Sequence, residues 1–156
     1  RDSHCKLDTR HGRGMVMSKN LIAQLTIHEG EKRFVYKDTT GNWTIGIGRN
    51  ISPGGMGLSE DEIHLLLRND IRRIDNELAN AFRFYIDLDP VRRDALINLC
   101  FNVGITRLKR FKLALRALEV GDYEESALEF LDSLWAEQVG QRAKDVAYMI
   151  ETGEYP

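Results

Sequence analysis

Cysteine and proline are scarce in this sequence, and their scarcity limits the classes of protein it can belong to. Two cysteines and three prolines occur among 156 residues. Cys5 lies in a polar N-terminal segment and Cys100 in the apolar run 95–103, so we expect no disulfide scaffold and predict Cys100 to be a small buried hydrophobe. The scarcity of proline, beside many Leu, Ala, Glu and Arg residues, favours helices over an all-β fold.

The chain also lacks an excess of charge and a long apolar run. Its 22 Lys and Arg residues nearly balance 24 Asp and Glu residues, for a formal net charge of -2, so we expect no nucleic-acid partner. No apolar segment approaches the roughly 20 residues of a membrane span, so stable membrane insertion is not expected. With 42% hydrophobic residues, the chain can form one globular domain or two small lobes that share a helix.

Residues 1–16 differ in character from the rest of the chain. They start with Arg and lack both apolar periodicity and the apolar region of a signal peptide, so we interpret them as a disordered leader or tag. Met15 or Met17 is the candidate natural start. Scattered histidines such as His4 and His11 are more typical of a flexible tail than of a metal site. We therefore expect neither a metal nor a cofactor.

The apolar spacing after Ser18, the expected N-cap, predicts a helix that ends before Gly30. Its apolar residues share one face: Leu21, Ile22 and Leu25. Glu29 follows Leu25 by four residues and therefore lies on that face. Two interpretations of Glu29 remain open: a carboxylate at a frayed helix end, or a functional acid partly shielded from water.

The pattern then changes to a period of two, which indicates strands. Residues 34–36, the turn-forming residues 38–42 and a second strand Trp43–Ile47 together predict a β-hairpin. Gly46 and Gly48 remove side chains from one face of the second strand. The floor of a cleft would explain why that face carries no side chains.

Helical patterns occupy the rest of the sequence. An apolar stripe from Ser59 to about Asn80 predicts one long helix, and Asp70 lies on this stripe, where a buried acid needs a partner. Asp89 is the expected N-cap of a helix that ends at Gly104, and shorter segments follow at 108–121, 122–135 and 141–151. The predicted fold class is α+β, mostly α. It has a small β-hairpin lobe at about 17–58, a linking helix at about 59–80 and an all-α lobe at about 81–156.

Three residues near the hairpin form a candidate catalytic group. Glu29, Asp38 and Thr44 fall within 16 residues, close enough in sequence to reach one rim. Glycoside hydrolysis requires two carboxyl groups in unlike environments, one protonated to assist the leaving oxygen and one ionised. Asp38, at an exposed turn, is expected to stay ionised.

The segments His28–Gly30, Tyr36–Thr39 and Gly41–Gly48 closely resemble the catalytic region of phage T4-type lysozymes, the endolysin family. The resemblance continues through 58–62, 89–98 and 135–144 and covers about residues 17–156. It implies a lysozyme-like two-lobe fold and a muramidase that cleaves the β-1,4 bond between N-acetylmuramic acid and N-acetylglucosamine with inversion. By the same resemblance Glu29 is the general acid, Asp38 the base, and Thr44 helps to hold the attacking water.

The resemblance also implies residues that bind the substrate: Asn50, Phe101, Asn102 and Arg142. Core packing is an equally good interpretation of Phe101, and we expect Trp135 to belong to the core. Arg49 stands where the family usually has His, so we predict a salt bridge between Arg49 and Asp70. The loop 51–57 is shorter than the stretch that the family has at this place.

The resemblance implies bacterial peptidoglycan as the substrate. It predicts a monomeric endolysin that is made in the host cytoplasm, needs a holin to reach the wall, and causes lysis. A lytic transglycosylase is an alternative, although it does not require the Asp and Thr that place a water. A second alternative is a tail-associated wall-digesting module or a catalytically silent structural domain.

Overall fold

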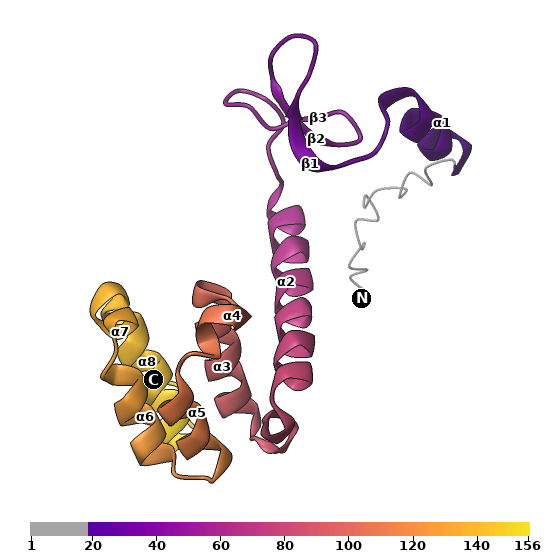
Figure 1. Cartoon of the computed structure of the whole chain (residues 1–156). Helices are drawn as coiled ribbons and strands as arrows, with labels where there is room; N and C mark the ends of the chain where they lie inside the picture. The colour runs from indigo at the N-terminus through magenta and orange to yellow at the C-terminus, as the bar shows by residue number, and fades with distance from the viewer. Residues whose placement is uncertain (1–18) are drawn as a thin grey trace, which may run out of the picture. The chain divides into compact units, whose positions relative to one another are not determined.

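A computed structural model describes residues 19–156 of the chain, in two compact units that meet between Ser59 and Glu60. The first unit, residues 19–59, holds one helix and a sheet, and the second, residues 60–156, is helical (Figure 1). The predicted leader 1–16, Cys5 and the expected N-cap Ser18 lie outside the described residues. The α+β, mostly α fold class is confirmed.

The first unit contains α1 (Lys19–Glu29), β1 (Lys32–Lys37), β2 (Trp43–Gly46) and β3 (Arg49–Asn50). The helix ends where predicted: Gly30 has φ +72°, and its N–H donates to the Thr26 carbonyl at 3.0 Å. The predicted hairpin is confirmed as the antiparallel pair β1 and β2, with Tyr36 opposite Thr44.

The sheet has a third strand that the sequence analysis missed. The strand expected to run to Ile47 ends at Gly46, and β3 pairs antiparallel with β2 so that Thr44 faces Asn50. Gly46 and Gly48 have φ of +66° and +70°, which residues with a side chain rarely adopt. With these dihedral angles the chain reverses direction between β2 and β3. Gly48 therefore lies in a tight turn and not on the strand, so the prediction that both glycines clear one face of the second strand is wrong.

Burial within the first unit is slight. Thr44, in the central strand, is the only buried residue among 19–59. The predicted apolar face of α1 is exposed instead of buried: Leu21, Ile22 and Leu25. A single helix and three short strands offer no second layer within this unit to cover that face.

The second unit consists of helices, whose bounds are α2 (Glu60–Ala81), the 3-10 helix η1 (Arg83–Asp87), α3 (Pro90–Val103), α4 (Ile105–Leu108), α5 (Lys112–Glu119), α6 (Tyr123–Leu131), α7 (Leu134–Val139) and α8 (Gln141–Thr152). The predicted cap of α3 is confirmed, because Asp89 accepts from the Arg92 N–H at 3.1 Å. The segment predicted at 108–121 is divided between α4 and α5, and the segment at 122–135 between α6 and α7.

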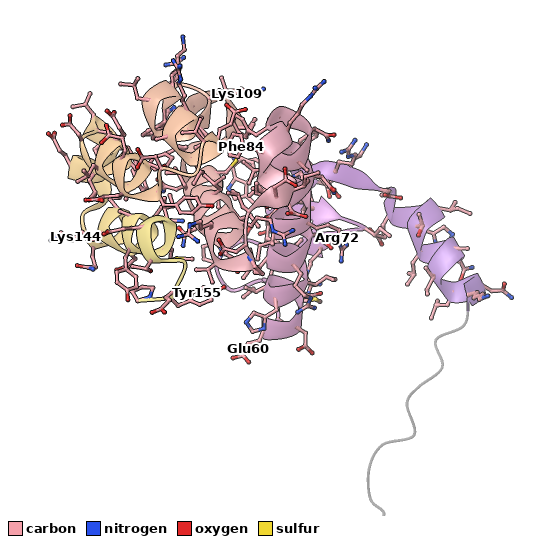
Figure 2. The ribbon with its side chains drawn as sticks, turned by 90° about the horizontal axis from the view of Figure 1, so that it is seen from below. Glu60, Arg72, Phe84, Lys109, Lys144 and Tyr155 are labelled. Atoms are coloured by element: carbon pink, nitrogen blue, oxygen red, sulfur yellow. The ribbon has the colours of Figure 1, made fainter. Side chains whose placement is uncertain are left out.

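The core of the second unit forms where α6 packs against α5 and α8, and α3 packs against α2 and α8. Figure 2 shows these packed side chains, with Lys109 and Lys144 at the outer surface. Trp135 and Cys100 are buried, as predicted, and burial raises the pKa of the Cys100 thiol.

The apolar stripe of α2 is buried only in part. Ile74 and Leu78 belong to the core, whereas the preceding four residues of the stripe are exposed: Ile63, Leu66, Leu67 and Ile71. The predicted long helix is confirmed as α2, and the buried residues of its stripe lie toward its C-terminal end. None of the described helices is long and apolar enough to cross a membrane.

Candidate active site

Glu29 is the last residue of α1, and its side chain lies against the turn between β2 and β3. A Cβ atom added at Gly48 would lie 2.7 Å from Glu29 Oε2 and 3.2 Å from its carboxyl carbon. The missing side chain of Gly48 therefore makes room for the Glu29 carboxyl group, a contact that the sequence pattern did not predict. Glu29 is nonetheless exposed, so the described residues of its own unit do not supply the shielding expected of a half-buried acid.

Asp38 follows β1 directly and begins the hairpin turn. Its Oδ1 atom accepts three hydrogen bonds: from the Thr40 hydroxyl at 2.8 Å, the Thr40 N–H at 2.9 Å and the Asn42 N–H at 2.9 Å. These donors favour the ionised form and hold the pKa of the Asp38 carboxyl below its usual value, with the Thr40 hydroxyl the largest cause. The expectation that Asp38 stays ionised is therefore supported by a named set of donors.

Thr44 lies in the middle of the sheet, paired with Tyr36 on one side and Asn50 on the other. Its side chain is 2% exposed, and its hydroxyl donates to the Asn42 carbonyl at 3.3 Å. The hydroxyl oxygen keeps its lone pairs as acceptors because its proton is directed to that carbonyl.

The residues Glu29, Asp38 and Thr44 thus belong to one unit, each placed by a different element. Glu29 lies at the end of α1, Asp38 lies in the hairpin turn that its own side chain stabilises, and Thr44 lies in the central strand. Together they offer an exposed carboxyl group, an ionised carboxylate and a hydroxyl. These are the groups that water-dependent glycoside cleavage uses.

Asn50 is mainly an organiser of the loop that follows β3. Its Oδ1 accepts from the Ser52 N–H at 2.9 Å, and its carbonyl accepts from the Met56 and Gly57 N–H groups at 2.9 and 3.3 Å. A Cβ at Gly55 would lie 2.6 Å from Asn50 Oδ1, so glycine is needed for the loop to fold over this side chain. The side-chain oxygen of this predicted substrate residue is therefore engaged within the loop.

Two of the other predicted substrate residues line one pocket in the second unit. Phe101 and Arg142 share a pocket of about 400 Å³ with Asn98. The Arg142 guanidinium donates to Asn98 Oδ1 at 2.8 Å and to the Asn98 carbonyl at 3.0 Å, which fixes its direction. A larger pocket, of about 590 Å³, lies beside Phe111 and Trp135 and contains none of the predicted site residues.

Asn102 is tied to the core through Trp135. Its Oδ1 accepts from the Trp135 Nε1–H at 2.8 Å, and Trp135 is 7% exposed. A nearly buried N–H needs an acceptor, and Asn102 supplies it. The sequence pattern did not predict this structural role.

Arg49 and Asp70 lie in different units, so the salt bridge predicted between them stays a prediction. Arg49 Nε donates to the Gly57 carbonyl at 2.7 Å. Asp70 accepts from Arg73 at 3.2 Å. Each residue thus has a partner close to it in sequence.

Two residues of the site were missed by the sequence analysis. Thr40 and Asn42 both donate hydrogen bonds to Asp38. An Asp side chain often binds the backbone N–H two residues further along, so the spacing Asp-x-Thr could have identified Thr40. Among the described residues there is no group of three or more His, Cys, Asp or Glu side chains that could hold a metal ion.

Comparison with known proteins identifies the family. The Phage lysozyme family model matches residues 26–147. Probable T4-type lysozyme 2 of Dictyostelium discoideum is 31% identical over 88% of this chain and 96% of its own length. The endolysin of Salmonella phage P22 is 31% identical over 78% of this chain and 84% of its own length. The chain therefore belongs to the phage lysozyme family.

This family consists of peptidoglycan-lysing glycosidases of the lysozyme type, which agrees with the carboxyl groups and hydroxyl found in the first unit. A third relative has a different context. The pre-baseplate central spike protein Gp5 of Enterobacteria phage T4 is 26% identical over 86% of this chain but over only 28% of its own length.

Proposed function

We propose that the chain is an N-acetylmuramidase that hydrolyses the β-1,4 bond between N-acetylmuramic acid and N-acetylglucosamine with inversion. The observation that carries this proposal is the state of Asp38. One of its carboxylate oxygens, Oδ1, accepts three hydrogen bonds, and hydrogen bonds from Thr40 and Asn42 hold the pKa of the carboxyl group below its usual value. A carboxylate fixed and ionised in this way is suited to accept a proton from water.

The proposed roles follow from where each group lies. Glu29, exposed at the end of α1, donates its proton to the leaving glycosidic oxygen as the C–O bond breaks. Asp38 Oδ2 takes a proton from the water that forms the new C–O bond on the opposite face of the sugar. Thr44 accepts a hydrogen bond from that water through its hydroxyl lone pairs. Inversion results because water, and not a carboxylate, attacks the anomeric carbon.

Substrate contacts in the second unit are part of the proposal. Phe101 and Arg142 line one pocket together with Asp94, and an aromatic face beside a fixed guanidinium and a carboxylate offers stacking and hydrogen bonds to a sugar. Asn50 and Asn102 remain predicted substrate residues, with the side-chain oxygen of each already engaged in the fold. We propose residues 17–156 as the catalytic domain.

We further propose that the protein acts as a monomeric endolysin made in the host cytoplasm. It reaches peptidoglycan after a holin permeabilises the membrane, and it then lyses the host. A wall-digesting module of a phage tail is the second candidate. The similarity to the T4 spike protein favours it, because there a segment like this chain forms a minor part of a larger protein.

The test is digestion of purified peptidoglycan by the wild type, Glu29→Gln and Asp38→Asn, with the released ends analysed by mass spectrometry. Hydrated reducing muramic acid ends, lost in both variants, are expected. Anhydro ends would instead indicate a lytic transglycosylase. Absence of cleavage by wild type with a native circular dichroism spectrum would indicate a silent structural domain. The α or β configuration of the first product, read by NMR, tests inversion.

A further inference from the structure

The turn that begins at Asp38 contains a chain of side-chain hydrogen bonds that none of the roles above uses. Asn42 Nδ2 lies 2.7 Å from Thr40 Oγ1, and Thr40 Oγ1 lies 2.8 Å from Asp38 Oδ1. The backbone closes the same turn, because the Asp38 N–H donates to the Asn42 carbonyl and the Gly41 N–H donates to the Asp38 carbonyl, each at 3.0 Å. The three side chains are therefore held on a fixed frame.

The chemistry of the groups sets the direction of both side-chain hydrogen bonds. A threonine hydroxyl has one proton, an amide nitrogen can only donate, and an ionised carboxylate can only accept. Thr40 Oγ1 therefore accepts from Asn42 and gives its single proton to Asp38. Asn42 thereby fixes the rotation of the Thr40 hydroxyl toward the carboxylate.

This arrangement treats the two oxygens of Asp38 differently. Oδ1 receives the Thr40 hydroxyl and the N–H groups of Thr40 and Asn42 at 2.8–2.9 Å, and none of these three bonds reaches Oδ2. Three bonds to one oxygen prevent the carboxylate from rotating about its Cβ–Cγ bond. Oδ2 is consequently the oxygen left to meet a water molecule.

We propose that Thr40, oriented by Asn42, is a positioning residue of the hydrolytic reaction: it holds the Asp38 carboxylate so that Oδ2 receives the proton of the attacking water. This inference rests on the proposed function, in which Asp38 is the base. Thr40 does not itself touch the reacting atoms. Its effect is on the orientation and the ionisation of its neighbour.

The surroundings of the turn leave Thr40 as the main influence on Asp38. Its hydroxyl is the largest cause of the lowered pKa of Asp38, ahead of the Asn42 backbone, and no charged group contributes. Lys37, the charged residue next in sequence, has its Nζ 5.0 Å above the Trp43 ring. Removal of the Thr40 hydroxyl is therefore expected to raise the pKa of Asp38.

The chain offers a matched set of variants. Thr40→Val removes the hydroxyl but keeps the β-branched shape and the N–H, Thr40→Ser keeps the hydroxyl, and Asn42→Ala removes the donor that orients it. Thr39→Val is the control, because Thr39 is an exposed residue of the same turn and makes no side-chain hydrogen bond among the described residues.

Two measurements on the full-length protein test the proposal. The first follows the Asp38 carboxyl carbon by NMR through an acid titration, assigned with Asp38→Asn. The second records kcat and KM on soluble peptidoglycan fragments across pH. Thr40→Val is expected to titrate at higher pH than wild type, to shift the acidic limb of the kcat profile the same way, and to lower kcat about 10-fold with KM unchanged.

The remaining variants decide whether the effect is positional. Thr40→Ser is expected to restore both the titration and kcat, Asn42→Ala to show a smaller change in the direction of Thr40→Val, and Thr39→Val to match wild type. An unchanged Asp38 titration in Thr40→Val, or an equal effect of Thr39→Val, would overturn the inference. If Asp38→Asn keeps full activity while Thr40→Val still shifts the Asp38 titration, Asp38 is not the base. The hydrogen bonds from Asn42 through Thr40 to Asp38 would then orient the carboxylate without a role in the reaction.

Discussion

The Glu29 carboxyl group occupies the space that a side chain at Gly48 would need, with Oε2 2.7 Å from the position of that Cβ atom. Gly48 has φ +70°, and Gly46, two residues earlier, has φ +66° with nothing within 4 Å of its own Cβ position. Both glycines have a positive φ, at which any substituted residue would be strained, and only Gly48 adjoins the candidate acid. Substitutions at the two positions therefore distinguish the effect of a collision with Glu29 from the effect of backbone strain in the turn.

Gly48→Ala is expected to displace the Glu29 side chain and to lower kcat on peptidoglycan by about 100-fold. Gly46→Ala carries the same unfavourable φ without the collision, so its loss of activity should be far smaller. Both variants should lose about 1 kcal/mol of unfolding free energy in urea titrations. Equal kcat values for the two variants would show that the space beside Gly48 does not matter to the acid.

Asn102→Ala should destabilise the protein by about 1–2 kcal/mol, because it leaves the Trp135 indole N–H without its acceptor in a nearly buried position. The loss should vanish in a Trp135→Phe background, which contains no N–H to satisfy. Thermal unfolding of the four proteins of this cycle measures the coupling. A raised KM with unchanged stability would instead assign Asn102 to substrate binding alone.

Arg92 joins the ends of two helices, and its loss should be among the costliest in the second unit. Its guanidinium donates to the Ile150 and Glu151 carbonyls at 2.7 and 2.9 Å and to Asp89 at 2.7 Å. It also lies 3.6 Å from the centre of the Tyr123 ring. Arg92→Ala is expected to lose about 3 kcal/mol of unfolding free energy, since unpaired carbonyls and a lost stacking contact add together.

Arg92→Lys should recover only a small part of that stability, because an ammonium cannot reproduce the planar fork. Arg72→Ala is the control, as Arg72 is exposed and makes no hydrogen bond or ion pair among the described residues. Urea unfolding followed by circular dichroism provides the comparison. A loss in Arg92→Ala no larger than in Arg72→Ala would contradict the structural role.

Tyr85 should make the stability of the second unit fall at alkaline pH. Burial, and then the 2.6 Å hydrogen bond from its hydroxyl to Asp75, raise the pKa of Tyr85 well above its ordinary value of 10.0. The stabilisation from its neutral form is complete below about pH 10 and is lost as pH rises above that value, because only the unfolded chain ionises there. The stability difference between wild type and Tyr85→Phe should therefore shrink between pH 9 and pH 11, roughly the range around an ordinary tyrosine pKa.

The measurement is the unfolding free energy of wild type and of Tyr85→Phe at pH 8 to 11. This range covers about one to two units on either side of an ordinary tyrosine pKa. A difference that stays constant over this range would show that Tyr85 ionises as readily in the folded protein as in the unfolded one. Tyr155, whose pKa is also raised by its hydrogen bond to Asp94, is present in both proteins and cancels in the comparison.

Local signals in the sequence were sufficient for the helix ends and the hairpin. The Gly30 stop, the Asp89 cap and the turn at 38–42 each depend on the conformational preference or hydrogen bonding of a few adjacent residues, so the sequence expresses them directly. The strand β3 escaped notice because it is two residues long, too short for a period to register. The division of 108–121 into two helices was missed because apolar spacing continues across the break.

The sequence by itself determined the fold class, the family and the candidate catalytic residues, because apolar periodicity, turn chemistry and motif spacing are properties of neighbouring positions. Only the tertiary structure decided what each side chain touches. It bound the Asn102 side chain to Trp135 and the Asn50 side chain to its own loop, gave Asp38 one saturated oxygen, and placed Glu29 over Gly48. Such contacts depend on the directions of side chains from separate elements, and those directions are fixed only when the backbone has folded.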